Sequence, residues 1–524
     1  MSSRAPGSGF AAVLRVQLRT GWKALVIWIG ALLGGYIATV GAIDGLYSTP
    51  EQLATYDATV AGDPAMAAIN GTPYGADTLG GVTSNEFGFI SAIAIPLMGL
   101  LLVVRHTRAQ EENGMLELLR SRGVGARAPW SAAATVAVLA LVIVGAGMAL
   151  TLIAYGEDAE GAVLYGASIA GLGIVFVGIA TFVGQLLRRA GTVTGIGILI
   201  LGGAYITRAI GDVRDNAWKW LSPLAWQQET RPFTDEPRVW PLLLALGVGA
   251  VLIAAGLVLV GGRDLGASMV STRSGPARAS ALLRTSPGLA LRMHAPSGVA
   301  WIAGAFVVAV VFGAFTDDIA DAIGANPAME AFFGGATSVN EAYVGLSLVL
   351  VVLMAIGAVG QAIWRVRSEE TGGRLEPTLA RSIPRPWWLA SHTIVMAVFA
   401  AATLLAGAAG LEWTAGSEVE GIFAAGAAYL PALLVVLGLA VAVFGALPRS
   451  TAVIWIALGY IAFVAILGDT VSLPDWAMAI SPVDAVGRVP SEDVSAAAEW
   501  ILSGIGVALL AVGFTGFRVR NIPR

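Results

Sequence analysis

Residues 131–154 read SAAATVAVLALVIVGAGMALTLIA, an apolar run that contains no charged residue and no proline. At 1.5 Å per residue, a helix of this length spans about 36 Å, which is enough to cross a hydrocarbon core of about 30 Å. A run this long and this apolar is typical of a transmembrane helix. The same pattern recurs along the chain, and this recurrence decides the fold class.

Twelve charge-free runs of 17 to 26 residues alternate with polar segments. The sequence therefore predicts an all-α polytopic membrane protein with about 12 transmembrane helices. The six expected spans of the first half are about 24–43, 87–104, 131–154, 161–186, 191–207 and 239–262. The six of the second half are about 299–315, 342–364, 388–411, 421–446, 452–468 and 500–517.

The composition agrees with a chain that lies mostly in lipid. Apolar residues make up 56% of the sequence and charged residues 13%, whereas soluble proteins carry about 25% charged residues. The sequence has no cysteine, which excludes disulfides, thiol nucleophiles and cysteine-ligated metals. The net charge of −4 says nothing about an acidic partner, because the two charge signs separate across the predicted membrane.

This charge separation predicts the orientation. With both termini on one side, that side carries 25 of the 31 Lys and Arg but 7 of the 35 Asp and Glu. Because cytoplasmic loops retain Lys and Arg, both termini are predicted to be cytoplasmic. The first span follows Arg15, Arg19 and Lys23 and is expected to be a retained helix rather than a signal peptide. Residues 10–22 mix apolar and basic positions, which predicts a short helix on the inner membrane surface.

An internal repeat divides the chain. The inner loop after span two reads RHTRAQEENGMLELLRSRGVGARAPW from Arg105, and the loop after span eight reads RVRSEETGGRLEPTLARSIPRPWW from Arg365. Both contain Glu-Glu-x-Gly, then Leu-Glu, then basic residues and Pro-Trp. This predicts two six-span halves, 1–262 and 299–524, joined by a cytoplasmic linker with an inner-surface helix at 263–298. Since each half has an even number of spans, the repeat is expected to be of the parallel kind.

Several chemistries are excluded or disfavoured. No phosphate-binding loop occurs, because the only lysines, Lys23 and Lys219, lack the preceding glycines. His106, His294 and His392 have no metal-site spacing, so neither a metal site nor a catalytic residue is predicted. The expected spans contain no Asp, Glu, Lys or Arg, which argues against ion-coupled transport. We therefore expect energy from elsewhere and a path suited to hydrophobic or amphiphilic cargo.

The paired inner loops are the strongest candidate site. Leu116 and Leu119 are three residues apart and can share one face of a short helix that docks into a partner. Acids at matched positions in both loops favour docking over a loop that only sets topology with positive charge. The predicted coupling residues are Glu111, Glu112, Gly114, Leu116, Glu117, Arg120, Glu369, Glu370, Gly372, Arg374, Leu375 and Glu376.

A second pair of motifs lies where spans two and eight begin. Asn85-Glu86 and Asn340-Glu341 are candidates for an outer gate. A purely structural alternative is a helix cap, in which Ser84 or Asn85 caps the helix and Glu86 faces its positive end.

At these motifs the sequence resembles the permease subunits of bacterial ATP-binding-cassette exporters, particularly the polyketide-antibiotic exporter group. That group has the pattern Arg-x-Glu-Glu-x-x-Gly-Arg-Leu-Glu after spans two and eight. The second copy here, Arg367 to Glu376, keeps the pattern with an added glycine at Gly373, whereas Met115 replaces the expected arginine in the first copy. The resemblance covers the whole chain.

The resemblance implies a separate cytoplasmic ATPase, in two copies, that engages the inner loops and binds ATP and Mg, with no cofactor in this chain. It also implies export of antibiotic- or drug-like compounds across the bacterial inner membrane. Two alternatives remain open. One is an ion-coupled secondary transporter, and the other is an integral membrane enzyme acting on lipid, for which Asp317-Asp318 is the candidate acid pair.

Overall fold

The computed structural model describes residues 9–60, 64–270, 278, 280–314, 316, 339–380, 383–416, 419–467, 473–492 and 494–521. Within these ranges every regular element is a helix. The chain forms two compact units, residues 1–274 and 275–524, and each unit is described by itself.

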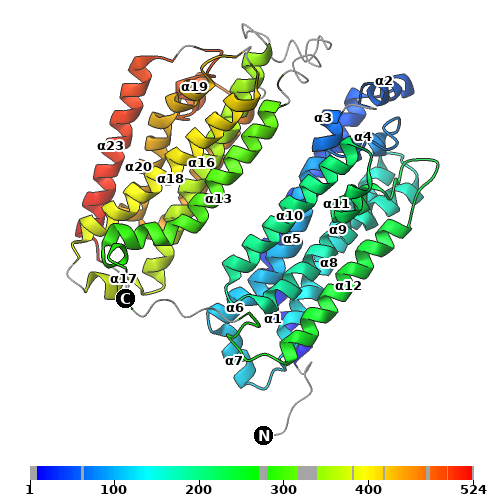
Figure 1. Ribbon diagram of the computed structural model, residues 1–524, viewed down its shortest axis with the longest axis horizontal. Coiled ribbons are helices and arrows are strands. Elements are labelled where there is room, and N and C mark those ends of the chain that lie inside the picture. The colour runs from blue at the N-terminus through cyan, green and yellow to red at the C-terminus, as the bar shows by residue number, and fades with distance from the viewer. Residues whose placement is uncertain are drawn as a thin grey trace. The chain divides into compact units, whose positions relative to one another are not determined.

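Unit 1 is a bundle of long helices with short helices at both ends (Figure 1). The long helices are α1 (Phe10–Leu46), α5 (Gly88–His106), α8 (Ala128–Ala154), α9 (Ala159–Leu186), α10 (Ala190–Val213) and α12 (Trp240–Gly261). The short helices α6 (Arg108–Glu112) and α7 (Met115–Ser121) lie at the end that we predict to be inner. The opposite, predicted outer end carries α2 (Pro50–Val60), α3 (Pro64–Ile69), α4 (Leu79–Glu86), η1 (Ala217–Leu221) and α11 (Pro223–Gln228).

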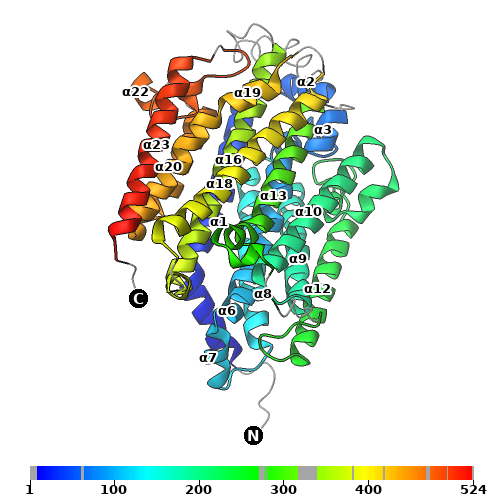
Figure 2. The ribbon, with the colours of Figure 1, turned by 60° about the vertical axis from the view of Figure 1, so that its left-hand side comes forward.

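Unit 2 is also a bundle of helices (Figure 2). Its longer helices are α13 (Ser286–Ala314), α16 (Val339–Thr371), α18 (Arg385–Thr414), α20 (Leu430–Ala446), α21 (Val453–Leu467) and α23 (Ala496–Val519). The short helix α19 (Ile422–Ala428) leads directly into α20. The remaining short elements are η2 (Leu282–Arg284), α17 (Leu375–Leu379), η3 (Pro448–Ser450), α22 (Asp475–Met478) and η4 (Asp484–Val486).

Eleven helices among the described residues are long and apolar enough to cross a membrane, and Val453–Ile466 is a shorter apolar helix. The prediction of an all-α polytopic membrane protein is therefore confirmed. The parallel relation of two six-span halves remains a prediction.

Helix packing relies on small residues, as expected where lipid gives apolar side chains no reason to associate. Gly145 of α8 and Gly166 of α9 face each other so closely that a Cβ on either residue would collide with the carbonyl oxygen of the other. In unit 2, a Cβ on Gly445 of α20 would collide with the backbone of Gly513 in α23. Glycine at these positions sets how closely the helices approach.

The first helix differs from its prediction. Helix α1 runs without a break from Phe10 to Leu46, so residues 10–22 are its first turns and not a separate surface helix. The reason is a specific contact, because the buried Gln17 amide donates hydrogen bonds to the carbonyl oxygens of Pro129 (3.1 Å) and His106 (3.4 Å). These bonds hold the start of α1 against the ends of α5 and α8.

Helix α10 extends beyond the predicted span and includes two charged residues. The predicted span ended at residue 207, but the helix continues to Val213 and includes Arg208 and Asp212. Arg208 is only 2% exposed and donates hydrogen bonds to the carbonyl oxygens of Ala68 (2.8 Å) and Ile69 (2.9 Å). A rule that ends a span at its first charged residue cannot detect such partners.

Candidate functional site

The first inner loop consists of two short helices and a tight turn. Helix α5 ends at His106, and Thr107, with φ −123° and ψ −88°, separates it from α6. Asn113 and Gly114 then reverse the chain into α7. Gly114 has φ +73°, a left-handed conformation that glycine adopts without steric cost.

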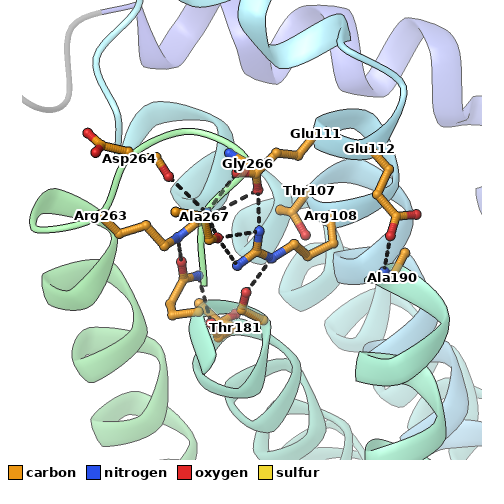
Figure 3. Close-up of polar contacts among 12 residues, drawn as sticks. Thr107, Arg108, Glu111, Glu112, Thr181, Ala190, Arg263, Asp264, Gly266 and Ala267 are labelled. Atoms are coloured by element: carbon orange, nitrogen blue, oxygen red, sulfur yellow. Dashed lines mark hydrogen bonds and ion pairs between the residues drawn. The ribbon is translucent and has the colours of Figure 1, made fainter. Parts of the chain in front are cut away.

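Glu111 is buried between two arginines, as Figure 3 shows. Arg108, one turn earlier, donates to Oε2 at 3.0 Å. Arg263, directly after α12, donates to both carboxylate oxygens at 2.7 and 3.0 Å. The backbone N–H of Gly266 adds a fourth hydrogen bond at 2.7 Å. We call Arg108, Glu111 and Arg263 the Glu111 triad.

Surrounding groups satisfy the remaining donors of the Glu111 triad. Arg108 donates to the carbonyl oxygen of Gly184 at the end of α9 and to that of Ala267. Arg263 donates to the side-chain oxygen of Gln185 at 3.0 Å. The guanidinium carbons of Arg108 and Arg263 lie 5.9 and 5.7 Å from the ring centroid of Trp130, within the range of a cation–π contact. The triad thus connects α6 to the ends of α9 and α12.

Glu112, the next residue, has a different role. Its side chain is exposed and accepts a hydrogen bond of 2.9 Å from the backbone N–H of Ala190, the first residue of α10. A carboxylate there satisfies an otherwise unpaired helix donor and faces the positive end of the helix dipole. Figure 3 shows Glu112 pointing away from Glu111 toward this helix start.

The second inner loop contains a matching arrangement. Helix α16 continues without interruption to Thr371, so Glu370 lies in its last turn. Arg367, one turn earlier, donates to Glu370 at 2.7 Å, and Arg520, directly after α23, bonds to both carboxylate oxygens. We call Arg367, Glu370 and Arg520 the Glu370 triad. The guanidinium of Arg520 lies 5.2 and 5.0 Å from the ring centroids of Phe444 and Phe517.

The contacts correct the alignment of the two loops. The sequence pattern paired Glu111 with Glu369 and treated Gly373 as an insertion. By burial and partners, Glu111 corresponds to Glu370, and the left-handed Gly114 corresponds to Gly373, whose φ is +69°. The register difference is then 259 throughout, since 370 − 111 and 373 − 114 are equal, and no residue is inserted.

The remaining coupling candidates divide by exposure. Leu116 and Leu375 are buried within their own units (4% and 2% exposed), so neither side chain lies on the surface that a partner would meet. The outward side of α7 instead carries two apolar residues, Met115 (49% exposed) and Leu118 (64%). Five of the predicted coupling residues are also exposed, namely Glu117, Arg120, Gly372, Arg374 and Glu376.

One ion pair of the second loop is open to solvent. Arg374 pairs with Glu369 at 2.9 Å, and the two side chains are 60% and 24% exposed. The hydrogen bond to Glu369 raises the pKa of Arg374. This pair contrasts with the buried Glu370 triad one residue further along the chain.

The first outer motif fastens two short helices together. The hydroxyl of Tyr56 in α2 donates to Glu86 at 2.5 Å and accepts from the Asn85 amide at 2.8 Å. Burial and the nearby Glu86 charge raise the pKa of Tyr56. The predicted cap by Ser84 or Asn85 is wrong, because these residues end α4.

The cap of α4 is Thr78, whose side chain accepts from the N–H of Gly81. In unit 2, Asn340 is 8% exposed and Glu341 lies in the first turn of α16. Asp317-Asp318, the acid pair of the enzyme alternative, lies outside the described residues.

Sequence reasoning missed the partners that follow the last helix of each unit. Arg263 and Arg520 both come directly after the final long helix, a recurrence that could have been noticed. Nothing in the spacing, however, indicates that they reach carboxylates 152 and 150 residues away.

The helices define the class of protein. It is a multi-pass, all-α membrane protein with two compact bundles, and the described residues contain no metal-binding cluster. The chain is 34% identical over 538 residues to the multidrug efflux system permease protein Rv1217c of Mycobacterium tuberculosis, an alignment that covers 99% of this chain and 97% of that protein. Residues 283–518 match the family model described as the C-terminal domain of multidrug efflux system permease Rv1217c. The chain therefore belongs to the Rv1217c family of multidrug efflux system permeases.

Proposed function

We propose that this chain is the membrane-spanning permease of an ATP-driven exporter that moves hydrophobic or amphiphilic, drug-like compounds out of the cell. The observation that carries the proposal is the relationship to Rv1217c along the full length of both chains. The orientation that we propose, both termini cytoplasmic in the bacterial inner membrane, follows the distribution of Lys and Arg. No residue of the chain is assigned a catalytic role.

The energy comes, in this proposal, from a separate cytoplasmic ATPase that binds ATP and Mg. Two copies would engage the two units, one through α7 and one through α17. On α7 the exposed Met115 and Leu118 lie beside Glu117 and Arg120, an apolar patch with a charged rim that suits a protein partner. Glu111, on the helix that precedes this patch, is buried and paired with Arg108 and Arg263.

The test is to purify the tagged, full-length protein from its native membrane in mild detergent and to identify stoichiometric companions. A phosphate-loop ATPase at two copies per chain supports the proposal. Its absence across several mild detergents overturns it. A Leu118→Glu variant is expected to lose the ATPase, because it places a charge in the apolar patch, whereas Val163→Thr, at an exposed position in α9, retains it.

A second candidate is an ion-coupled secondary transporter, and one observation favours it. Arg208 and Asp212 lie buried within α10, with Arg208 Nε 3.9 Å from the Asp212 carboxylate, and ionisable residues in a spanning helix commonly serve ion coupling. Export from vesicles that stops when the proton gradient is collapsed at constant ATP supports this candidate. Export that follows ATP and ignores the gradient excludes it.

A further inference from the structure

Each triad joins two segments that are far apart in the chain. In unit 1, Arg108 and Glu111 belong to the inner loop, whereas Arg263 follows the last helix, α12. In unit 2, Arg367 and Glu370 end α16, whereas Arg520 follows α23. The same chemistry thus ties the inner loop to the last spanning helix within each unit.

The connection is stiff because its charges are buried. The Glu111 side chain is 3% exposed and its partners Arg108 and Arg263 are 1% and 7% exposed. In unit 2, Glu370 is 1% exposed, Arg367 16% and Arg520 11%. Separating the carboxylate from the arginine that follows the last helix would leave that buried guanidinium without its counter-charge, so the segments strongly favour moving together.

Each triad has one carboxylate and two guanidinium groups, and the two arginines are not equivalent. Arg108 and Arg367 are one turn from their glutamate, so those bonds stay within the loop. Arg263 and Arg520 are the members that join the glutamate to the segment directly after the last helix of the unit. Removing only that arginine therefore removes the ionic part of the connection and leaves each glutamate paired. In unit 1 the hydrogen bonds from the Gly266 N–H to Glu111 and from Arg108 to the Ala267 carbonyl oxygen remain.

We propose that Arg263 and Arg520 are positioning residues that transmit a displacement of each inner loop into the last helix of the same unit. The inference rests on the proposed function and deepens it, because it says which helices an ATPase docked on the loops would move. Helix α12 would follow α6 and α7, and helix α23 would follow α16 and α17. In contrast, the side-chain hydrogen bond from the first loop to α10 is made by the exposed Glu112.

The experiment uses the full complex, the chain with its ATPase, reconstituted in phospholipid vesicles with a fluorescent hydrophobic dye as cargo. The variants are Arg263→Gln, Arg520→Gln and the pair together. We expect ATP hydrolysis and ATPase binding to stay within about twofold of the parent. Export per ATP is expected to fall by about tenfold in the pair, the size of a typical coupling between sites.

Two variants serve as controls. Arg518→Gln removes an arginine from the last turn of α23, two residues from Arg520, but its side chain is exposed and is not a member of the Glu370 triad. Export per ATP should therefore stay at the parental value. Arg263→Lys keeps the positive charge beside Glu111 but cannot form the two parallel hydrogen bonds of the guanidinium, so it should restore only part of the coupling lost in Arg263→Gln. A role in folding alone would instead lower export and ATP hydrolysis in parallel.

A second measurement keeps this inference separate from the ATPase partner. In the isolated chain, hydrogen exchange of residues 263–268 and of α6 should speed up together in Arg263→Gln, because the Gly266 N–H is bonded to Glu111. If no ATPase is recovered, the proposed function fails, and this exchange result still decides whether the connection exists. Unchanged exchange, or normal export per ATP in the Arg263→Gln and Arg520→Gln pair, overturns the inference.

Discussion

The two inner loops hold equivalent glutamates in differently built surroundings. In unit 1 the helix is interrupted at Thr107, between α5 and α6. Glu111 accepts four hydrogen bonds, one of them from the backbone of Gly266. In unit 2, α16 runs straight through and Glu370 is held by Arg367 and Arg520 alone among the described residues. One carboxylate between two arginines, rather than the local helix geometry, is therefore what the two loops have in common.

The largest expected effect comes from removing the shared carboxylate. Glu111→Gln or Glu370→Gln leaves two buried arginines facing each other without a counter-charge, which we expect to cost about 3–5 kcal/mol of stability. Thermal unfolding in detergent measures this. The loss should be greater for Glu111, which accepts more hydrogen bonds than Glu370. Equal and small losses in both variants would remove the basis of the comparison.

A second buried glutamate with basic partners lies at the opposite end of unit 1, and its removal should have the next largest effect on stability. Glu229 is buried (1% exposed) and pairs with Lys219 (2.9 Å), Arg231 (2.9 Å) and Arg238 (3.2 Å), and the hydroxyl of Tyr74 also donates to it at 2.8 Å. Burial alone would raise the pKa of Glu229, but the hydrogen bonds from Lys219 and Tyr74 and the nearby positive charges outweigh it and hold the pKa below its ordinary value.

A lowered carboxyl pKa in the folded state means that the stabilisation is complete above the unfolded pKa and is lost as the pH falls through the folded value. We therefore expect unit 1 to lose stability below about pH 4. Glu229→Gln should remove about 1–3 kcal/mol at neutral pH and flatten this dependence. The measurement is the unfolding midpoint of parent and variant from about pH 3 to about pH 7, a range that includes the ordinary pKa of a carboxyl group. Parallel curves for the two proteins would contradict the expectation.

The turn glycines test the corrected register at smaller cost. Gly114 and Gly373 have φ near +70°, and neither has a neighbour within 4 Å of an added Cβ. Gly114→Ala and Gly373→Ala should therefore cost only the backbone strain, about 1–2 kcal/mol each. Asparagine tolerates this conformation, so Gly114→Asn and Gly373→Asn serve as controls and should cost less. A loss at one glycine only would mean that the two turns are not equivalent.

Sequence reasoning recovered what depends on local composition. Spans are visible because apolar length is read directly from the chain, and the two inner loops because their motif recurs. It could not tell which face of α7 looks inward, since Leu116 and Leu118 are both leucines and only tertiary packing separates them. Nor could it pair Glu111 with Arg263 or see Arg208 as buried, because these contacts join distant segments.

The smallest expected effect comes from the exposed ion pair beside the Glu370 triad. Arg374→Gln breaks the contact with Glu369, but solvent screens both charges, and exposed pairs contribute about 0–1 kcal/mol. The expected change in unfolding midpoint is correspondingly small and should shrink further at high salt. Arg520→Gln, measured in parallel, should destabilise more and respond less to salt, since its pair with Glu370 is buried. If both variants behaved alike, burial would not distinguish Glu369 from Glu370. The Glu-Glu pair of the second loop would then consist of two equivalent residues, rather than one exposed residue and one buried residue.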